Sequence, residues 1–331
     1  MQKKFKLSRN SKFALQIICG FTLALVTIPV LFVMALSNRG EDEITTFTTW
    51  NATTKQTDTE QFYITVYRTE TSVFETIEFE RYIIGVVAAE MPALFEMDAL
   101  RAQAIVARTY ATRILEHDEY ILDTIMHQVF LDDEQLRTRW GDSFEIHHAT
   151  IEEAVKSTKG IILTYDDEPI TAMFFAMSNG ATENSEDVFG TSRPYLRSVP
   201  STGYEGRADF EVKEYFNLDT LRNAFNDNEI TADNIMILNH SEGGNVANVT
   251  IGTKNYTGRQ VREILGLRSA AFTITLTEDH ATFTTHGNGH GVGMSQHGAN
   301  IMAQKGHNYE EILQHFYQNV TLVEKKFINV E

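Results

Sequence analysis

The chain has 331 residues, of which 42% are hydrophobic, 22% are charged and only 5 are proline, a composition typical of a globular protein. The charge is distributed unevenly. Residues 1–39 hold six of the 28 basic side chains and no acidic one, so residues 40–331 carry 22 basic and 45 acidic side chains. A body with a net charge of −23 repels the nucleic-acid backbone, which excludes nucleic-acid binding as its main function.

The single cysteine, Cys19, limits what thiol chemistry can supply. One cysteine forms no intramolecular disulfide and no multi-thiolate zinc site. Cys19 also lies within an apolar segment, where a reactive thiolate is not expected.

That apolar segment, residues 13–36, contains 24 residues without a charge. A helix needs roughly 20 residues to cross a bilayer core, so the sequence predicts a transmembrane anchor. The basic tail, residues 1–12, is expected in the cytoplasm and the rest of the chain outside the membrane. A cleaved signal peptide is the alternative, with Val33 and Ala35 at positions −3 and −1 of the cleavage site. Residues 37–61 are polar and lack apolar periodicity, which predicts a linker.

The body, residues 62–331, mixes predicted strands and helices without regular strand–helix–strand alternation, which indicates a single domain of the α+β class. Its clearest helix is 97–116, where apolar residues from Leu100 to Ile114 recur at helical spacing as one stripe. In chain order, the predicted elements are a strand at 62–67, helices at 78–89, 97–116 and 148–157, strands at 160–165 and 170–177, a helix at 218–226, a strand at 248–251, a helix at 258–265, a strand at 272–276, and helices at 299–304 and 309–317.

The first candidate for chemistry is Glu90, in the segment GVVAAEMP at residues 85–92. Met91 precedes proline and is therefore biased against helical dihedral angles, so the helix is predicted to end near Glu90. A carboxylate there faces the negative end of the helix macrodipole, and apolar neighbours, Leu94 among them, are expected to desolvate it. Both effects raise its pKa, as a general acid that works near neutral pH requires. A solvated glutamate at a helix end is the alternative.

The second candidate is the segment HGNGHGVGMSQHG at residues 286–298, in which every second residue from 287 to 293 is glycine. Alternate glycines allow a backbone to approach a ligand closely. The spacing fits neither a dinucleotide-binding motif nor a phosphate-binding loop. The histidines lack acidic or thiolate partners at metal-ligand spacing, so no metal site is predicted. A glycine-rich structural turn is the alternative. The segment brings together three histidines, His286, His290 and His297, with Ser295 and Gln296.

The third candidate is the polar stretch 176–190, which follows a predicted buried strand. Its small hydroxyl and amide side chains suit hydrogen bonding to sugar or peptide. Glu183, Glu186 and Asp187 also make it the best source of a second carboxylate. A plain surface loop is the alternative.

Six segments together carry a resemblance to a known family. They are GVVAAEMP at 85–92, ALRAQAIVARTYA at 99–111, SEDVFG at 185–190, PYLRSV at 194–199, TGRQVREILGLRS at 257–269 and GHGVGMSQHGA at 289–299. In this order, over about residues 62–325, the chain resembles the stage II sporulation protein D (SpoIID) family of membrane-anchored lytic transglycosylases.

The resemblance implies an enzyme that cleaves the bond between N-acetylmuramic acid and N-acetylglucosamine in peptidoglycan. Its substrate would be glycan strands without stem peptides, and its products 1,6-anhydro ends, during septal wall remodelling and engulfment in sporulation. Glu90 matches the catalytic acid of the family. The positions that match its ligand contacts are Gln103, Arg108, Ser178, Tyr195, Arg197, His290, Ser295, Gln296 and His297.

The resemblance also implies a place and partners. The body would lie outside the cell membrane at the sporulation septum, on the mother-cell membrane. The implied partners are glycan strands, the amidase stage II sporulation protein P and the membrane protein stage II sporulation protein M. Some members of the family bind zinc through cysteine and histidine, but this body has no cysteine, so no metal or other cofactor is expected.

Two other classes of function stay open. A two-carboxylate muramidase needs Glu183, Glu186 or Asp187 at about 5 to 9.5 Å from Glu90, and it yields a reducing end. A non-catalytic glycan-binding domain is the other alternative, because related domains occur in amidase enhancers. Such a domain would bind glycan and release no fragments.

Overall fold

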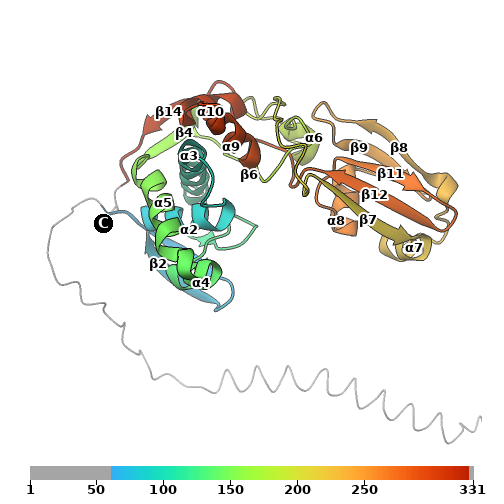
Figure 1. Ribbon diagram of the computed structural model, residues 1–331, viewed down its shortest axis with the longest axis horizontal. Coiled ribbons are helices and arrows are strands. Elements are labelled where there is room, and N and C mark those ends of the chain that lie inside the picture. The colour runs from blue at the N-terminus through green and yellow to red at the C-terminus, as the bar shows by residue number, and fades with distance from the viewer. Residues whose placement is uncertain (1–60, 328–331) are drawn as a thin grey trace, which may run out of the picture. The chain divides into compact units, whose positions relative to one another are not determined.

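The computed structural model describes residues 61–327 and shows a mixed α+β fold, as the sequence predicted (Figure 1). The predicted basic tail and anchor, and the predicted linker up to residue 60, lie outside the described residues. Within residues 61–327, no helix is both long enough and apolar enough to span a bilayer. The described residues all belong to one compact unit, Asp58–Glu331.

Helices and short strands follow one another in irregular order along this unit. The helices are α2 (Phe79–Glu90), α3 (Met97–Leu115), α4 (Asp133–Trp140), α5 (Phe144–Lys156), α6 (Ser185–Phe189), α7 (Leu218–Phe225), α8 (Gly258–Leu265), α9 (Gln296–Gln304) and α10 (Tyr309–Phe316). The strands are β1 (Tyr63–Arg68), β2 (Val73–Glu78), β3 (Ile121–Leu122), β4 (Ile161–Tyr165), β5 (Glu168–Pro169), β6 (Phe174–Phe175), β7 (Glu211–Asn217), β8 (Ile235–His240), β9 (Val246–Ile251), β10 (Lys254–Tyr256), β11 (Phe272–Leu276), β12 (His280–His286), β13 (Met294–Ser295) and β14 (Thr321–Glu324).

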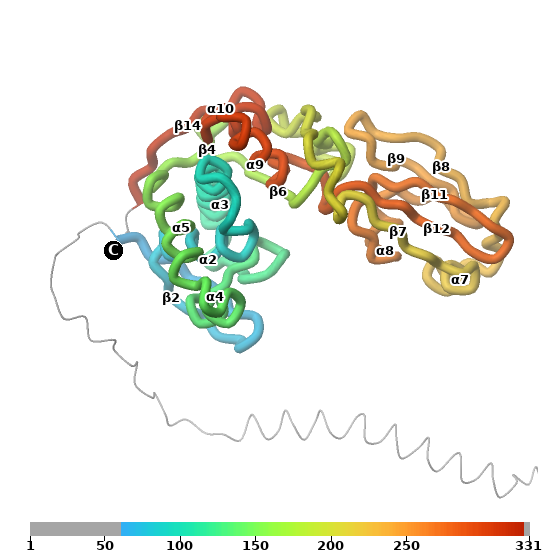
Figure 2. Tube along the Cα trace, viewed as in Figure 1, coloured from blue at the N-terminus to red at the C-terminus, as the bar shows by residue number. Residues whose placement is uncertain are grey.

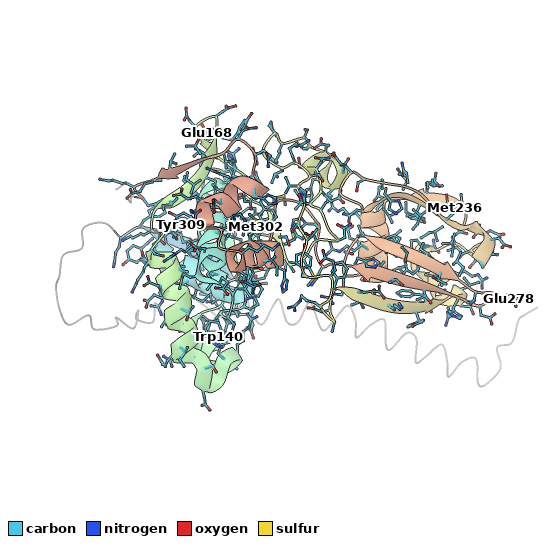
Figure 3. All side chains as sticks on the ribbon, turned by 45° about the horizontal axis from the view of Figure 1, so that its top comes forward. Trp140, Glu168, Met236, Glu278, Met302 and Tyr309 are labelled. Atoms are coloured by element: carbon cyan, nitrogen blue, oxygen red, sulfur yellow. The ribbon has the colours of Figure 1, made fainter. Side chains whose placement is uncertain are left out.

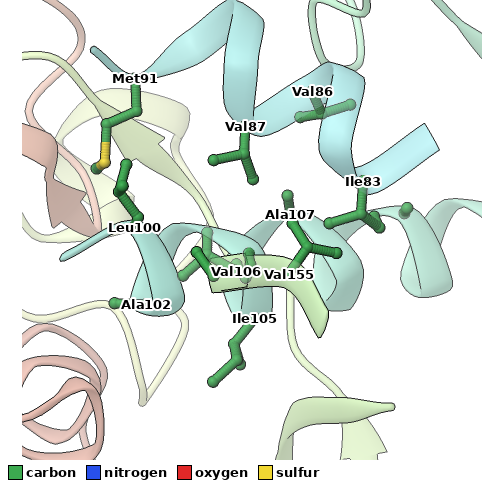
Figure 4. Close-up of a cluster of buried hydrophobic side chains, with 14 of the residues drawn as sticks. Ile83, Val86, Val87, Met91, Leu100, Ala102, Ile105, Val106, Ala107 and Val155 are labelled. Carbon is green, nitrogen blue, oxygen red and sulfur yellow. The ribbon is translucent and has the colours of Figure 1, made fainter. Parts of the chain in front are cut away.

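The first hydrophobic core forms around α3, which packs against α2, α5, α9, α10 and β4. In Figure 4, Val87 of α2 and Met91, which follows the helix, face Leu100 and Ala107 of α3. Because neighbours cover α3 on several sides, its buried residues extend beyond the predicted stripe and include Ile105. The helix is therefore a central one rather than a surface helix with one apolar face.

A second hydrophobic core lies within residues 211–286. Its strands form two antiparallel sheets, in the orders β11–β12–β7 and β10–β9–β8, and α7 and α8 contribute buried apolar residues. The chain leaves the first core after β6 and α6, builds the second core and returns at β13 (Figure 2). In Figure 3, Met236 and Glu278 belong to this second part, and Trp140 and Tyr309 to the first.

The apolar run 170–177 forms a shorter strand than predicted. Only β6 is paired there, in parallel with β13, and Met177 makes an isolated bridge with Asn288. The run is apolar because it is largely buried, and burial alone does not require a continuous ladder. The pairing places the glycine-rich segment 286–298 beside residues 173–183.

Candidate active site

Glu90 is the last residue of α2, as the sequence predicted. Met91 precedes Pro92 and adopts an extended conformation (φ −125°, ψ 138°). Its N–H donates to the Val87 carbonyl at 2.9 Å and closes the helix. Leu94, which was expected to desolvate the carboxyl, is 84% exposed. The end of α2 therefore matches the prediction, whereas the expected burial of Glu90 by Leu94 does not.

The environment of the Glu90 carboxyl favours the protonated acid. Burial raises its pKa, which is the predicted direction. Two groups oppose burial without cancelling it: Val129 N–H donates to Oε1 at 3.0 Å, and Arg139 adds a positive charge. Arg139 also donates to the carbonyls of Ala88 and Ala89, at 3.4 and 3.0 Å. Burial is the largest cause of the shift, and the Arg139 cation lies at the end of α2 where the macrodipole is negative.

The second carboxylate oxygen of Glu90 is available for chemistry. Among residues 61–327, Oε2 accepts no hydrogen bond, whereas Oε1 is held by Val129. The carboxyl group therefore has one fixed oxygen and one that can exchange a proton with a bound molecule.

Gly85 allows the segment that carries Val129 to approach α2. A Cβ at this position would lie 2.3 Å from Cε2 of Phe130 and 2.5 Å from the Leu131 carbonyl oxygen. Phe130 instead stacks on Tyr82, with ring centroids 5.3 Å apart. Neither Val129 nor Arg139 was predicted from the sequence. Val129 acts through its backbone N–H, and Arg139 lies on α4, a helix that was not predicted.

Part of the glycine-rich segment lies close to the chain that follows Glu90. The rings of Phe95 and His297 meet edge to face, with centroids 5.1 Å apart. The Gln296 amide donates to Oε1 of Gln103 at 3.4 Å, which joins α9 to α3. The structure thus brings the loop after Glu90 together with one end of this segment.

Two histidines of the glycine-rich segment are neutral at pH 7. Burial lowers the pKa of His290 to about 4, and Arg262 and Arg259 act in the same direction. Burial also lowers the pKa of His297. His297 is partly exposed and can offer a neutral donor or acceptor to a sugar. The His290 ring already has backbone partners, because Nδ1 accepts the Val292 N–H at 3.1 Å and the ring also hydrogen-bonds to the Phe174 backbone. Within residues 61–327, no three His, Cys, Asp or Glu side chains are grouped to hold a metal ion.

The four alternate glycines of this segment pack against the protein itself. All four have φ between 74° and 116°, where glycine is favoured. A Cβ at Gly287 would lie 2.5 Å from the Met177 carbonyl oxygen, and one at Gly293 would lie 2.0 Å from that of Met173. The structure therefore assigns these glycines to close contact with residues 173–183, which was the alternative to ligand approach.

Six of the nine expected ligand contacts are buried. Ser178, for example, donates to the Ser201 carbonyl at 2.8 Å. Ser295 caps α9 by accepting the Gly298 N–H at 3.1 Å. Side chains that are buried and hydrogen-bonded in this way stabilise the fold around the site. The six are Gln103, Arg108, Ser178, Tyr195, Ser295 and Gln296.

Arg108 is one of these six, and its guanidinium group lies in a structural ion pair. Nε and Nη2 donate to the two carboxylate oxygens of Glu80 at 2.9 and 2.7 Å. Nη1 and Nη2 also donate to the carbonyls of Ile161 and Val155, at 3.1 and 3.3 Å. These bonds tie α3 to α2, α5 and β4 and do not involve Glu90. We therefore do not carry Arg108 into the proposed substrate site.

The segment 194–199 is held by its own contacts. Arg197 forms a two-point ion pair with Glu186, with Nη1 and Oε1 2.6 Å apart. This pair lowers the pKa of Glu186 to about 2. Tyr195 accepts a hydrogen bond from Thr171 N–H at 3.1 Å. Of these two expected contacts, only Arg197 is partly exposed.

The carboxylates considered as a second catalytic group also have partners of their own. Glu186 pairs with Arg197. Glu183 is buried and accepts the Asn245 N–H at 2.9 Å. Asp187 accepts the Asn184 amide at 3.2 Å. Each of the three carboxylates is therefore held by a partner other than Glu90.

Fold and site together describe an α+β protein with a largely buried glutamate, Glu90, whose pKa is raised. Residues 67–165, which include Glu90, match the family model described as Stage II sporulation protein, SpoIID. The chain is 39% identical over 270 residues to Stage II sporulation protein D of Bacillus subtilis (strain 168), which covers 79% of each chain. The chain is also 39% identical over 270 residues to Stage II sporulation protein D of Bacillus amyloliquefaciens. That alignment covers 79% of this chain and 78% of the relative.

A more distant relative is the protein named amidase enhancer of Bacillus subtilis (strain 168). It is 27% identical over 293 residues, which cover 72% of this chain and 40% of that protein. The chain therefore belongs to the stage II sporulation protein D family, as the motifs indicated.

Proposed function

We propose that this sporulation protein is a lytic transglycosylase of peptidoglycan in which Glu90 is the only acid–base group. The observation that supports this most directly is the state of the Glu90 carboxyl. Burial raises its pKa, Val129 holds Oε1, and Oε2 is available to a substrate. A raised pKa is the direction that the first step requires, because in that step the acid gives its proton to the substrate.

In that step, Oε2 of Glu90 gives its proton to the glycosidic oxygen between N-acetylmuramic acid and N-acetylglucosamine. The bond from this oxygen to C1 of the muramoyl residue breaks, and N-acetylglucosamine leaves with a free hydroxyl. The Glu90 carboxylate then takes the proton of the muramoyl C6 hydroxyl as that oxygen attacks C1. A 1,6-anhydro ring forms, no water is consumed, and Glu90 is protonated again. One carboxyl group suffices, unlike the pair of an ordinary glycosidase.

The substrate that we propose is glycan from which an amidase has removed the stem peptides. We propose that the protein lies in the cell membrane at the sporulation septum. The apolar segment 13–36 would anchor it there, with the body outside. The proposed partners are stage II sporulation proteins P and M. Family membership and the uncharged length of the segment support these proposals.

A non-catalytic role in glycan binding is the second candidate, and the similarity to a protein named amidase enhancer favours it. Mass spectrometry of purified glycan incubated with the full-length protein separates the possibilities. We expect fragments with 1,6-anhydro ends. Reducing ends would indicate a muramidase, and bound but uncleaved glycan would indicate a binding protein.

A further inference from the structure

One buried arginine holds both ends of the Val129 segment, which we define as residues 123–132. Arg68, at the end of β1, is only 9% exposed. Its Nε donates to Oδ2 of Asp123 at 3.2 Å, and its Nη2 donates to Oδ2 of Asp132 at 2.9 Å. The first and last residues of the segment are thus fixed to the same guanidinium group.

Further contacts hold the segment between these two points. Thr69 N–H donates to the other oxygen of Asp123 at 3.0 Å. The Arg68 guanidinium lies 4.9 Å from the centre of the Phe130 ring. The Gln128 amide donates to the Ala107 carbonyl of α3 at 3.2 Å. Val129 lies between Gln128 and Phe130, so its N–H has a fixed position.

Arg68 also supports the helix that carries Arg139. Asp132 is the N-cap of α4 and forms a capping box with Gln135. Nη2 of Arg68 donates to Oε1 of Gln135 at 2.7 Å, in addition to its bond with Asp132. Arg139, near the end of this helix, donates to the last carbonyls of α2. Both groups that favour the Glu90 carboxylate therefore depend on contacts of Arg68.

We propose that Arg68 is a positioning residue for Glu90. By holding the Val129 segment and the start of α4, it keeps Val129 N–H and Arg139 against the end of α2, and so it sets how readily Glu90 gives up and regains its proton. The groups that act on Glu90 are Arg139 from α4 and Tyr82 from α2. Burial raises the pKa of Tyr82, so that side chain stays neutral. The contribution of this device to catalysis rests on the proposed function.

The test is a titration of Glu90 in the full-length protein, solubilised in detergent, with the glutamate carboxyl carbon labelled with ¹³C. The resonance of Glu90 is assigned by its absence in Glu90→Gln. Arg68→Gln removes the bonds to both aspartates, so Val129 N–H and Arg139 lose their fixed positions. We expect the pKa of Glu90 to rise by about one unit, as the loss of a hydrogen bond to a charged group implies. The alkaline limit of the pH–rate profile should move upward by the same amount.

Two further variants make the result specific. Glu75→Gln removes the ion pair that Arg68 makes on β2, outside the Val129 segment, and should leave the titration of Glu90 unchanged. Asp123→Asn weakens the contact of Arg68 with one end of the segment and should also raise the pKa of Glu90. This variant tests the proposal if Arg68→Gln does not fold. Arg68→Lys keeps the charge, so the pKa of Glu90 in this variant should lie between the values in the wild type and in Arg68→Gln.

A Glu90 titration that is unchanged in Asp123→Asn and in folded Arg68→Gln would overturn the proposal, even if both variants lose thermal stability. The titration needs no turnover, so it is independent of the proposed function. A shifted titration in a protein that makes no anhydro product would support the positioning role and reject the transglycosylase.

Discussion

At the scale of single residues, Arg108 has a stabilising role that its sequence motif does not reveal. It is fully buried and paired with Glu80, so Arg108→Ala leaves that carboxylate without its partner. Breaking a buried pair in this way costs about 3 to 5 kcal/mol of the free energy of unfolding. Denaturant unfolding measures this loss. Turnover per folded molecule should stay near that of the wild type.

The matched control is Arg101→Ala, on the same helix. Arg101 pairs with Asp98 near the surface, so its removal should cost less than about 1 kcal/mol. An Arg108→Ala variant that melts like the wild type and is inactive would contradict the structural role and return Arg108 to the substrate site.

Glu90 was predictable from the sequence because its cause is local. The proline at 92 ends α2, and the apolar residues of that helix lie next to Glu90 in the chain. The role of Arg108 was not predictable, because its partner Glu80 lies 28 residues away on another helix. Arg139 acts across an even longer separation, about 50 residues, on the carbonyls of α2.

The raised pKa of Glu90 predicts a particular dependence of stability on pH. Since the folded state holds this proton more tightly than the unfolded state, Glu90 favours folding below its unfolded pKa of about 4.3, and this contribution is lost as the pH rises through the higher folded pKa. Glu90→Gln removes the titration. Its melting temperature relative to the wild type should therefore increase between pH 4 and pH 7.5. A relative decrease would mean that folding lowers the pKa instead.

At the scale of elements, the contact between α2 and the Val129 segment depends on Gly85. In Gly85→Ala, the added methyl meets Phe130 and the Leu131 carbonyl at less than 3 Å, so the segment must shift. Overpacking of this kind costs about 1 to 3 kcal/mol, less what alanine gains in a helix. We expect this loss in thermal melts, together with at least about a tenfold loss of turnover, because Val129 N–H moves from Glu90.

Gly206→Ala is the control for this substitution, since a Cβ there meets no atom within 4 Å. It should leave stability and turnover unchanged. Wild-type turnover in Gly85→Ala would show that the position of the Val129 segment does not matter to the reaction.

Elements with strong apolar periodicity were predicted well, and polar ones were not. The helix 258–265 and the strand 272–276 have the predicted bounds. By contrast, α4 was missed because it is mostly polar and buries only Leu136. Its start does carry a local signal, the Asp132–Gln135 capping box, which would have indicated a helix.

At the scale of the whole molecule, the second hydrophobic core could not be predicted from local patterns. Its strands β7, β8 and β12 were not given as separate elements, because several of their residues are exposed or polar. They become strands through pairing with distant partners, as in the register of β7 with β12. The class of fold was predicted, whereas the division of the body into two cores was not.

The predicted anchor is testable in cells. If residues 13–36 span the membrane, protease added to intact protoplasts should remove the body and leave an N-terminal tag protected inside. Immunoblots for the tag and the body measure both. Recovery of a soluble form that begins near Leu36 would favour the cleaved signal peptide instead.

The most direct test of the account is the rate of anhydro-product formation by Glu90→Gln. Glutamine keeps the shape of the side chain and an oxygen for Val129 N–H, but it cannot give or take a proton. We predict a loss of about 10² to 10⁴-fold or more, with glycan binding retained and a normal thermal melt. A variant that binds glycan, melts normally and forms anhydro product at near the wild-type rate would show that Glu90 is not the acid.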